Sequence, residues 1–136
     1  MTGDNRVGMA MKYLLVASTE ACSGKSAVIL GIADRLQEKG IEIAYTQPVV
    51  SGNAANPLMD SDNELMAQAL SLPPERLGLP LLVLDAARSI DRVTGADTQD
   101  YAKLLTENVR HLPGSLVILE GGANLHEGSL FDLATA

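Results

Sequence analysis

The sequence predicts an α/β domain in which flanking helices cover a mainly parallel sheet. Two observations predict this class: short apolar runs bounded by loop residues recur along the chain, and stretches of helical periodicity separate them. The order is strand, helix, strand, helix, strand, helix, strand, which is typical of parallel sheets. Doubly wound folds usually carry five or more strands and only about four are expected here, so we expect a domain that is incomplete at its C-terminus.

The predicted strands are continuous apolar runs rather than alternating ones, as expected for strands inside a parallel sheet. The first is expected to be buried on both faces, the second to end before Pro48, and the last to lead directly into Glu120. These runs cover residues 13–17, 41–46, 79–84 and 116–119.

The clearest helix is expected from Lys25 onward. Its apolar residues recur at helical spacing, charged residues occupy the opposite face, and Gly40 follows in the position of a C-terminal cap. The apolar positions are Val28, Ile29, Ile32, Ala33 and Leu36.

Weaker patterns fill the remaining segments. Helices are expected over residues 61–70, with Ser61 as N-cap, and from Tyr101 to near Pro113. Residues 88–98 are charged without clear periodicity and are expected to form a loop, and residues 130–136 are expected to begin a helix. We therefore predict a mobile leader over residues 1–10 and one domain over residues 11–136.

Composition excludes several classes of partner. The net charge of −7 disfavours a general nucleic-acid surface or an anionic membrane surface, because both require an excess of Lys and Arg. The longest apolar run near the start is too short to span a membrane. Cys22 is the only cysteine, so no intrachain disulfide can form, and this fits a cytoplasmic protein.

The strongest chemical signal is a polar loop of small residues between the first strand and the first helix. Its Gly24-Lys25-Ser26 tripeptide opens the helix, where unbonded N–H groups and the helix dipole attract anions. Gly24 permits a close approach of the backbone, Lys25 supplies a full charge for outer phosphates, and Ser26 offers a hydroxyl to magnesium. The candidate nucleotide-binding residues are Thr19, Glu20, Ala21, Cys22, Ser23, Gly24, Lys25 and Ser26.

This loop has an alternative interpretation, because Thr19 stands where the common P-loop motif has its first glycine. The segment could be a turn followed by a helix with Ser23 as its N-cap. The flanking strand and helix favour the phosphate loop, and hence a fold like that of P-loop NTPases.

Carboxylates elsewhere provide candidate metal ligands. Glu120 ends a predicted strand before two glycines, a place from which it could hold magnesium directly or through water. The alternative is a solvated strand end. Asp62, with Asp60, follows a flexible loop, and either a metal or a helix cap would explain this pair.

Together these segments resemble dethiobiotin synthetase. They are most similar to the dethiobiotin-synthetase-like N-terminal domain of some bacterial phosphate acetyltransferases and to its stand-alone cyanobacterial homologues. The pieces that carry the resemblance lie at residues 18–26, 47–52, 60–62, 79–85, 97–101, 120–124 and 127–133.

The resemblance implies ATP and Mg²⁺ as cofactors. It implies that Gly24, Lys25 and Ser26 hold phosphates, and that Ser26, Asp62 and Glu120 are the magnesium ligands. Two departures bear on activity: Gln47 stands where the synthetase has a lysine, and Ser18 stands where it has the first glycine of the loop.

Two hypotheses follow for the function. One is a nucleotide-binding domain with a regulatory role or slow ATP hydrolysis. The other is a non-catalytic oligomerisation or sensory module that keeps only the fold. Because a four-stranded fragment leaves apolar surface or a sheet edge exposed, we expect a homo-oligomer or a partner protein.

Overall fold

The computed structural model describes residues 12–19, 24–51 and 63–121. The strands form two small parallel sheets, one of four strands in the order β1-β6-β2-β4 and one in which β3 pairs with β5. The predicted α/β class with a parallel sheet is therefore confirmed. The strands are β1 (Lys12–Val16), β2 (Ile43–Thr46), β3 (Val49–Ser51), β4 (Leu77–Gly78), β5 (Leu82–Leu84) and β6 (Leu116–Glu120).

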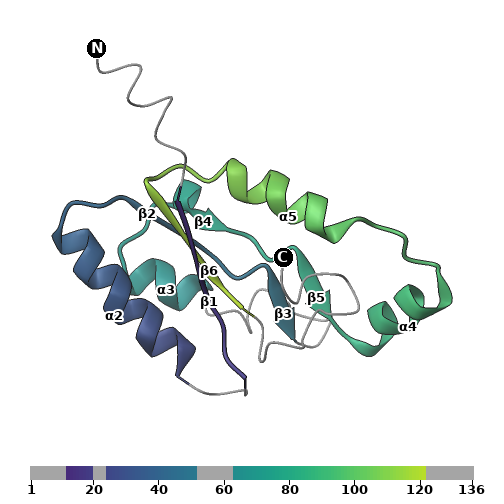
Figure 1. Ribbon diagram of the computed structural model, residues 1–136. Coiled ribbons are helices and arrows are strands. Elements are labelled where there is room, and N and C mark those ends of the chain that lie inside the picture. The colour runs from purple at the N-terminus through teal and green to yellow at the C-terminus, as the bar shows by residue number, and fades with distance from the viewer. Residues whose placement is uncertain (1–11, 20–23, 52–62, 122–136) are drawn as a thin grey trace, which may run out of the picture.

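Helices cover both faces of the four-stranded sheet (Figure 1). Helices α2 and α3 pack on one face, and α5 packs on the other. The helices are α2 (Lys25–Glu38), α3 (Asn63–Ala69), α4 (Ala86–Thr94) and α5 (Tyr101–Arg110), with a 3-10 turn at Pro74–Arg76.

The core follows from the alternation of side chains along β2 and β6. Ile43 and Tyr45 of β2 and Ile118 of β6 point toward α2 and α3, and all three are fully buried. Ala44 and Val117 alternate with them and point toward α5. Aliphatic residues at consecutive positions therefore supply both layers, as the continuous apolar runs predicted.

The first strand differs from its prediction. It was expected to be buried on both faces, but the side chains of Tyr13 and Leu15 are about half exposed. Among the described residues β1 pairs with β6 alone, so it lies at an edge of this sheet. A hollow of about 330 Å³ lies between Tyr13 and α5, because α5 packs over β2 and β6 and leaves the same face of β1 uncovered.

The first helix has its predicted bounds and its predicted glycine. Gly40 has a positive φ of 78° and donates its N–H to the carbonyl of Gln37 just past the helix. The buried stripe, however, is centred on Ile29 and Ala33, whereas Val28 is half exposed. The spacing of apolar residues predicted the helix. It did not predict which of two neighbouring apolar residues, Val28 or Ile29, faces the core.

The chain differs from the prediction just after the second predicted strand and within the third. Pro48 ends β2 as expected, but the chain resumes a strand immediately afterwards as β3. Across from it, Pro80 separates β4 from β5. The carbonyl of Pro48 accepts hydrogen bonds from the N–H groups of both Leu81 and Leu82, which holds the two interrupted strands side by side.

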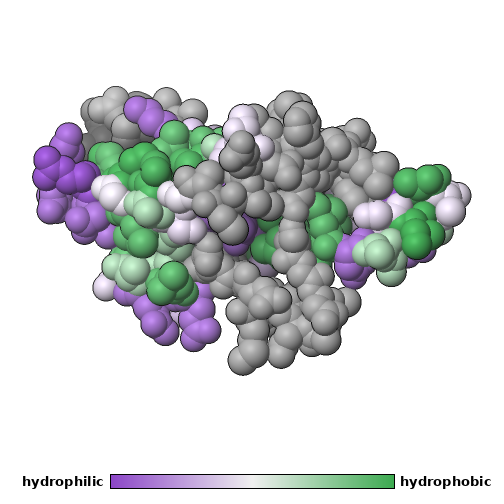
Figure 2. Space-filling view, turned by 90° about the horizontal axis from the view of Figure 1, so that it is seen from below, coloured by the Kyte–Doolittle hydropathy of each residue, from purple (hydrophilic) through white to green (hydrophobic). Residues whose placement is uncertain are grey.

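The predicted loop over residues 88–98 was wrong, because helix α4 occupies most of it. Asp85 caps the helix by accepting the N–H of Arg88 at 2.7 Å, and Gly95 ends it with a φ of 80°. Arg92 donates a hydrogen bond to the carbonyl of Gln99, whereas Ile90 and Val93 are exposed. Figure 2 shows the resulting hydrophobic patch on the protruding end formed by α4.

Several predictions lie outside the described residues. These are the leader over residues 1–10, the caps at Asp60 and Ser61, and the helix start at residues 130–136. Within the described part of the chain, no helix is both long enough and apolar enough to cross a membrane.

Candidate nucleotide-phosphate site

The site begins at the turn from β1 into α2. Gly24 is the N-cap of α2 and has a φ of 86°, a left-handed conformation that favours glycine over every other residue. The alternative in which Ser23 caps this helix is therefore wrong. Because glycine has no side chain, the N-cap residue leaves the positive end of the helix dipole uncovered on the loop side.

Lys25 is the first residue of α2, and its ammonium reaches back to Ser18, just after β1. Its Nζ donates a hydrogen bond to Ser18 Oγ at 2.9 Å, which joins the start of the loop to its end. Both side chains are half-buried. A full positive charge is thus held above the helix N-terminus, where an anion would meet the charge and the dipole together.

The next residue, Ser26, reaches across to the end of β6. Its Oγ donates to Glu120 Oε1 at 3.3 Å, although the two residues are 94 positions apart. The other carboxylate oxygen, Oε2, accepts a hydrogen bond from the phenol of Tyr45. Glu120 is only 2% exposed, so it is a buried carboxylate and not a solvated strand end.

A close backbone contact fixes Glu120 beside the loop. In the parallel register Glu120 lies next to Val16, and the N–H of Gly121 donates to the Val16 carbonyl at 2.8 Å. A Cβ on Gly121 would lie 3.2 Å from the Cβ of Ala17, tighter than most such contacts. Glycine after Glu120 therefore lets β6 approach the start of the loop.

Two residues beside this cluster were not among the sequence-predicted site residues. Tyr45 is fully buried and bonds Glu120; the only signal for it was a lone hydroxyl-bearing aromatic in an aliphatic strand. Gln47 follows two residues later. Its Oε1 is buried and has no hydrogen-bond partner among the described residues.

The structure places only part of the predicted set. Gly24, Lys25, Ser26 and Glu120 come together as just described, and Thr19 lies exposed in the bend after Ser18. The remaining predicted residues lie outside the described ranges, namely Glu20, Ala21, Cys22, Ser23 and Asp62.

A comparison with protein families agrees with this geometry. The model of a family described as an AAA domain matches residues 12–131, which is most of the chain and includes the whole site. The chain belongs to this AAA-domain family. It is therefore a P-loop nucleotide-binding domain.

The polar groups of this AAA domain fit a magnesium ion. Mg²⁺ prefers oxygen ligands, usually takes one or two carboxylates, and leaves its other positions to phosphates and water. Ser26 Oγ and Glu120 Oε1, at 3.3 Å, are near the roughly 2.9 Å that separates neighbouring ligands in an octahedron of Mg²⁺. No cluster of three or more His, Cys, Asp or Glu side chains occurs within the described ranges.

Proposed function

We propose that this P-loop domain binds ATP together with Mg²⁺ at the carboxyl ends of β1 and β6. Lys25 would bind the outer phosphates, and Ser26 and Glu120 would hold the magnesium ion. The observation that carries the proposal is the hydrogen bond between Ser26, in the first turn of α2, and the buried carboxylate of Glu120 at the end of β6. Bound magnesium would neutralise charge on the phosphates, as in other phosphoryl-transfer sites.

The chain's own residues would orient the nucleotide. The helix dipole of α2 and the Lys25 ammonium both favour negative charge above Gly24. Tyr45 would act as a positioning residue, because its phenol holds one oxygen of Glu120 and leaves the other directed at Ser26. We include Asp62 and loop residues 19–23 in the proposed site on the basis of sequence.

We further propose that the domain is of the dethiobiotin-synthetase-like type, acts in the cytoplasm, and is regulatory or hydrolyses ATP slowly. Gln47 supports this reading over synthetase activity. It is an uncharged amide where the resemblance expects a lysine, so it offers no positive charge to a carbamate or phosphate.

A second candidate function is a non-catalytic oligomerisation module. The observation that favours it is the half-exposed pair Tyr13 and Leu15 on the edge strand β1. Apolar side chains on an unpaired edge are typical of surfaces that associate with another chain.

Replacing Lys25 with alanine separates the two functions. In calorimetric titration with Mg-ATP, Lys25→Ala should weaken binding by roughly 10- to 100-fold, because a charge-assisted contact to phosphate is lost. Lys39→Ala is the matched control, since Lys39 is exposed at the other end of the same helix and should bind normally.

Equal affinity of wild type and Lys25→Ala would contradict a working phosphate loop. If neither protein binds Mg-ATP while sedimentation shows a stable oligomer, the oligomerisation module becomes the better account. Under the nucleotide-binding proposal, Lys25→Ala leaves the sedimentation behaviour unchanged, because Lys25 is not one of the half-exposed apolar residues of β1.

A further inference from the structure

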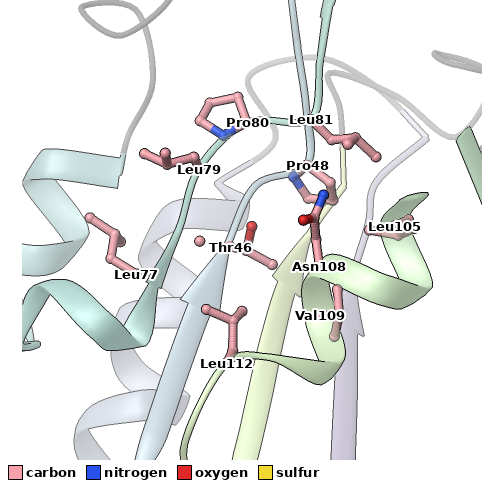
Figure 3. Close-up of a pocket in the computed structure, with 11 residues that line it drawn as sticks. Thr46, Pro48, Leu77, Leu79, Pro80, Leu81, Leu105, Asn108, Val109 and Leu112 are labelled. Atoms are coloured by element: carbon pink, nitrogen blue, oxygen red, sulfur yellow. The ribbon is translucent and has the colours of Figure 1, made fainter.

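A cavity of about 310 Å³ lies on the opposite side of β2 from the phosphate site. It opens where β2 and β4 end and the sheet gives way to the β3–β5 pair, with α5 forming its other wall (Figure 3). Tyr45 points toward α2 and Glu120, whereas the next residue, Thr46, lines this cavity. The two sites thus lie on opposite faces of one strand.

The lining of the cavity is uncharged and mostly aliphatic. Leucine, proline and valine side chains form nearly all of its wall, and none of its described lining residues is ionisable. The polar side chains are Thr46 and Asn108, and Figure 3 shows both directed into the same space. A phosphate or carboxylate would find no cation among the described lining residues, which separates this cavity from the proposed nucleotide site.

The hydroxyl of Thr46 provides a polar group on an otherwise apolar wall. Thr46 is only 4% exposed, and its side chain lines the cavity. Gly78 makes the room for it, because a Cβ at that position would lie 2.4 Å from Thr46 Oγ1.

The cavity is too large and too apolar to hold its water in an ordered arrangement. A volume of about 310 Å³ is about ten times the share of one water molecule, roughly 30 Å³, and each ordered water needs two to four polar partners. The described lining residues offer two polar side chains, so most of the water in the cavity is poorly ordered. A ligand binds more tightly when one of its apolar groups displaces poorly ordered water.

The depth of the cavity fits a small molecule rather than a peptide. Val109 and Leu112 lie deep and buried, whereas Leu79 is 73% exposed and Asn108 is exposed at the mouth. The volume is at the lower end of the range for ligand pockets. The aliphatic part of such a ligand would cover Leu79, and its polar end would reach Thr46.

We infer that this cavity binds a small, uncharged, largely aliphatic molecule that carries one hydrogen-bonding oxygen. The Thr46 hydroxyl and the Asn108 amide bond the oxygen, and the leucine and proline wall packs on the carbon skeleton. The inference is independent of the proposed nucleotide function, because the cavity shares no lining residue with the phosphate site.

The test is a titration of isotope-labelled full-length protein with cyclohexanol, followed by the shifts of backbone amide signals. We expect saturable shifts at Thr46, Gly78 and Asn108. Cyclohexanecarboxylate has a similar ring but a negative charge, and it should bind at least roughly tenfold more weakly, because the cavity would have to desolvate its charge without a cation.

Variants locate the polar contacts. Thr46→Val keeps the shape and removes the hydroxyl, so cyclohexanol affinity should fall roughly five- to tenfold. Thr98→Val, at an exposed threonine away from the cavity, should change nothing. Asn108→Leu, at an exposed position that tolerates substitution, provides a second polar deletion if Thr46→Val destabilises the fold.

The inference fails if wild type shows no saturable shifts, or if the shifts map away from the cavity. It also fails if cyclohexanecarboxylate binds as well as cyclohexanol. A further contrary result would be that Thr46→Val and Asn108→Leu fold correctly and bind cyclohexanol with the affinity of wild type.

Discussion

At the residue scale, the site consists of a few side chains whose roles follow from burial and contact. Lys25, Ser26 and Glu120 were all predicted from the sequence, because a Gly-Lys-Ser tripeptide and an acid after a strand are local signals. Tyr45 was not predicted. Its contact with Glu120 spans 75 positions, and such a pairing becomes visible only when the strands are placed side by side.

Tyr45→Phe tests the support of Glu120. The substitution keeps the buried ring and leaves one carboxylate oxygen without its donor, so the free energy of unfolding should fall by about 1–3 kcal/mol. Urea unfolding monitored by circular dichroism measures this. Tyr13→Phe loses the same hydroxyl from a half-exposed ring and should change stability by less than about 0.5 kcal/mol. Equal effects of the two variants would show that Tyr45 does not support Glu120.

At the scale of elements, the sequence predicted helices and strands whose apolar faces are buried, and it failed for a helix that buries no apolar face. Helix α4 has no buried residue and exposes Ile90 and Val93, so a search for an apolar core face does not find it. The resumption of the chain as β3 after Pro48 and the break between β4 and β5 were also missed. Prolines mark those breaks, but resumption of each strand depends on the neighbour across the sheet.

The junction between α4 and α5 is an electrostatic cluster. Arg88 donates to the Tyr101 hydroxyl at 3.2 Å, and that hydroxyl donates to Asp97 Oδ2 at 2.6 Å. The hydrogen bond from Tyr101 lowers the pKa of Asp97 below its ordinary value, with a further contribution from the N–H of Gln99. Burial, aided by the neighbouring Asp97, raises the pKa of Tyr101.

The lowered pKa of Asp97 predicts a pH dependence. Ionised Asp97 stabilises the folded state above its ordinary pKa of 3.8, and this contribution is lost as pH falls through the lower folded value. Asp97→Asn should therefore lower the melting temperature near pH 7, and the difference from wild type should shrink toward pH 3. Asp91→Asn, at an exposed carboxylate on α4, is the control and should track wild type. A difference that persists unchanged at low pH would contradict a role for the charge.

At the scale of the whole molecule, the parallel sheet was predictable and its strand order was not. Alternation of strands and helices implies parallel pairing, whereas the position of β6 between β1 and β2 depends on contacts between segments far apart in the chain. That same order brings the end of β6 beside the loop after β1. The proposed nucleotide site is therefore a consequence of topology as much as of motif.

The stability of this arrangement depends on the core between the sheet and helices α2 and α3. Ile118 is fully buried there, so Ile118→Ala should lower the free energy of unfolding by about 2–5 kcal/mol through lost burial and a cavity. Leu65→Ala, at a side chain that is 56% exposed on α3, should cost well under about 1 kcal/mol. Denaturant titration of both variants measures this difference, and similar losses would mean that the core lies elsewhere.

The most direct test of the central claim locates the metal. Mn²⁺ replaces Mg²⁺ at oxygen ligands and broadens nearby nuclear magnetic resonance signals. With ATP present, we predict selective broadening of the amide signals of Ser26, Glu120 and Gly121, while Lys39 at the far end of α2 stays sharp. Broadening confined to other acidic surfaces, or none with ATP and Mn²⁺ in excess, would contradict a magnesium-nucleotide site beneath this loop.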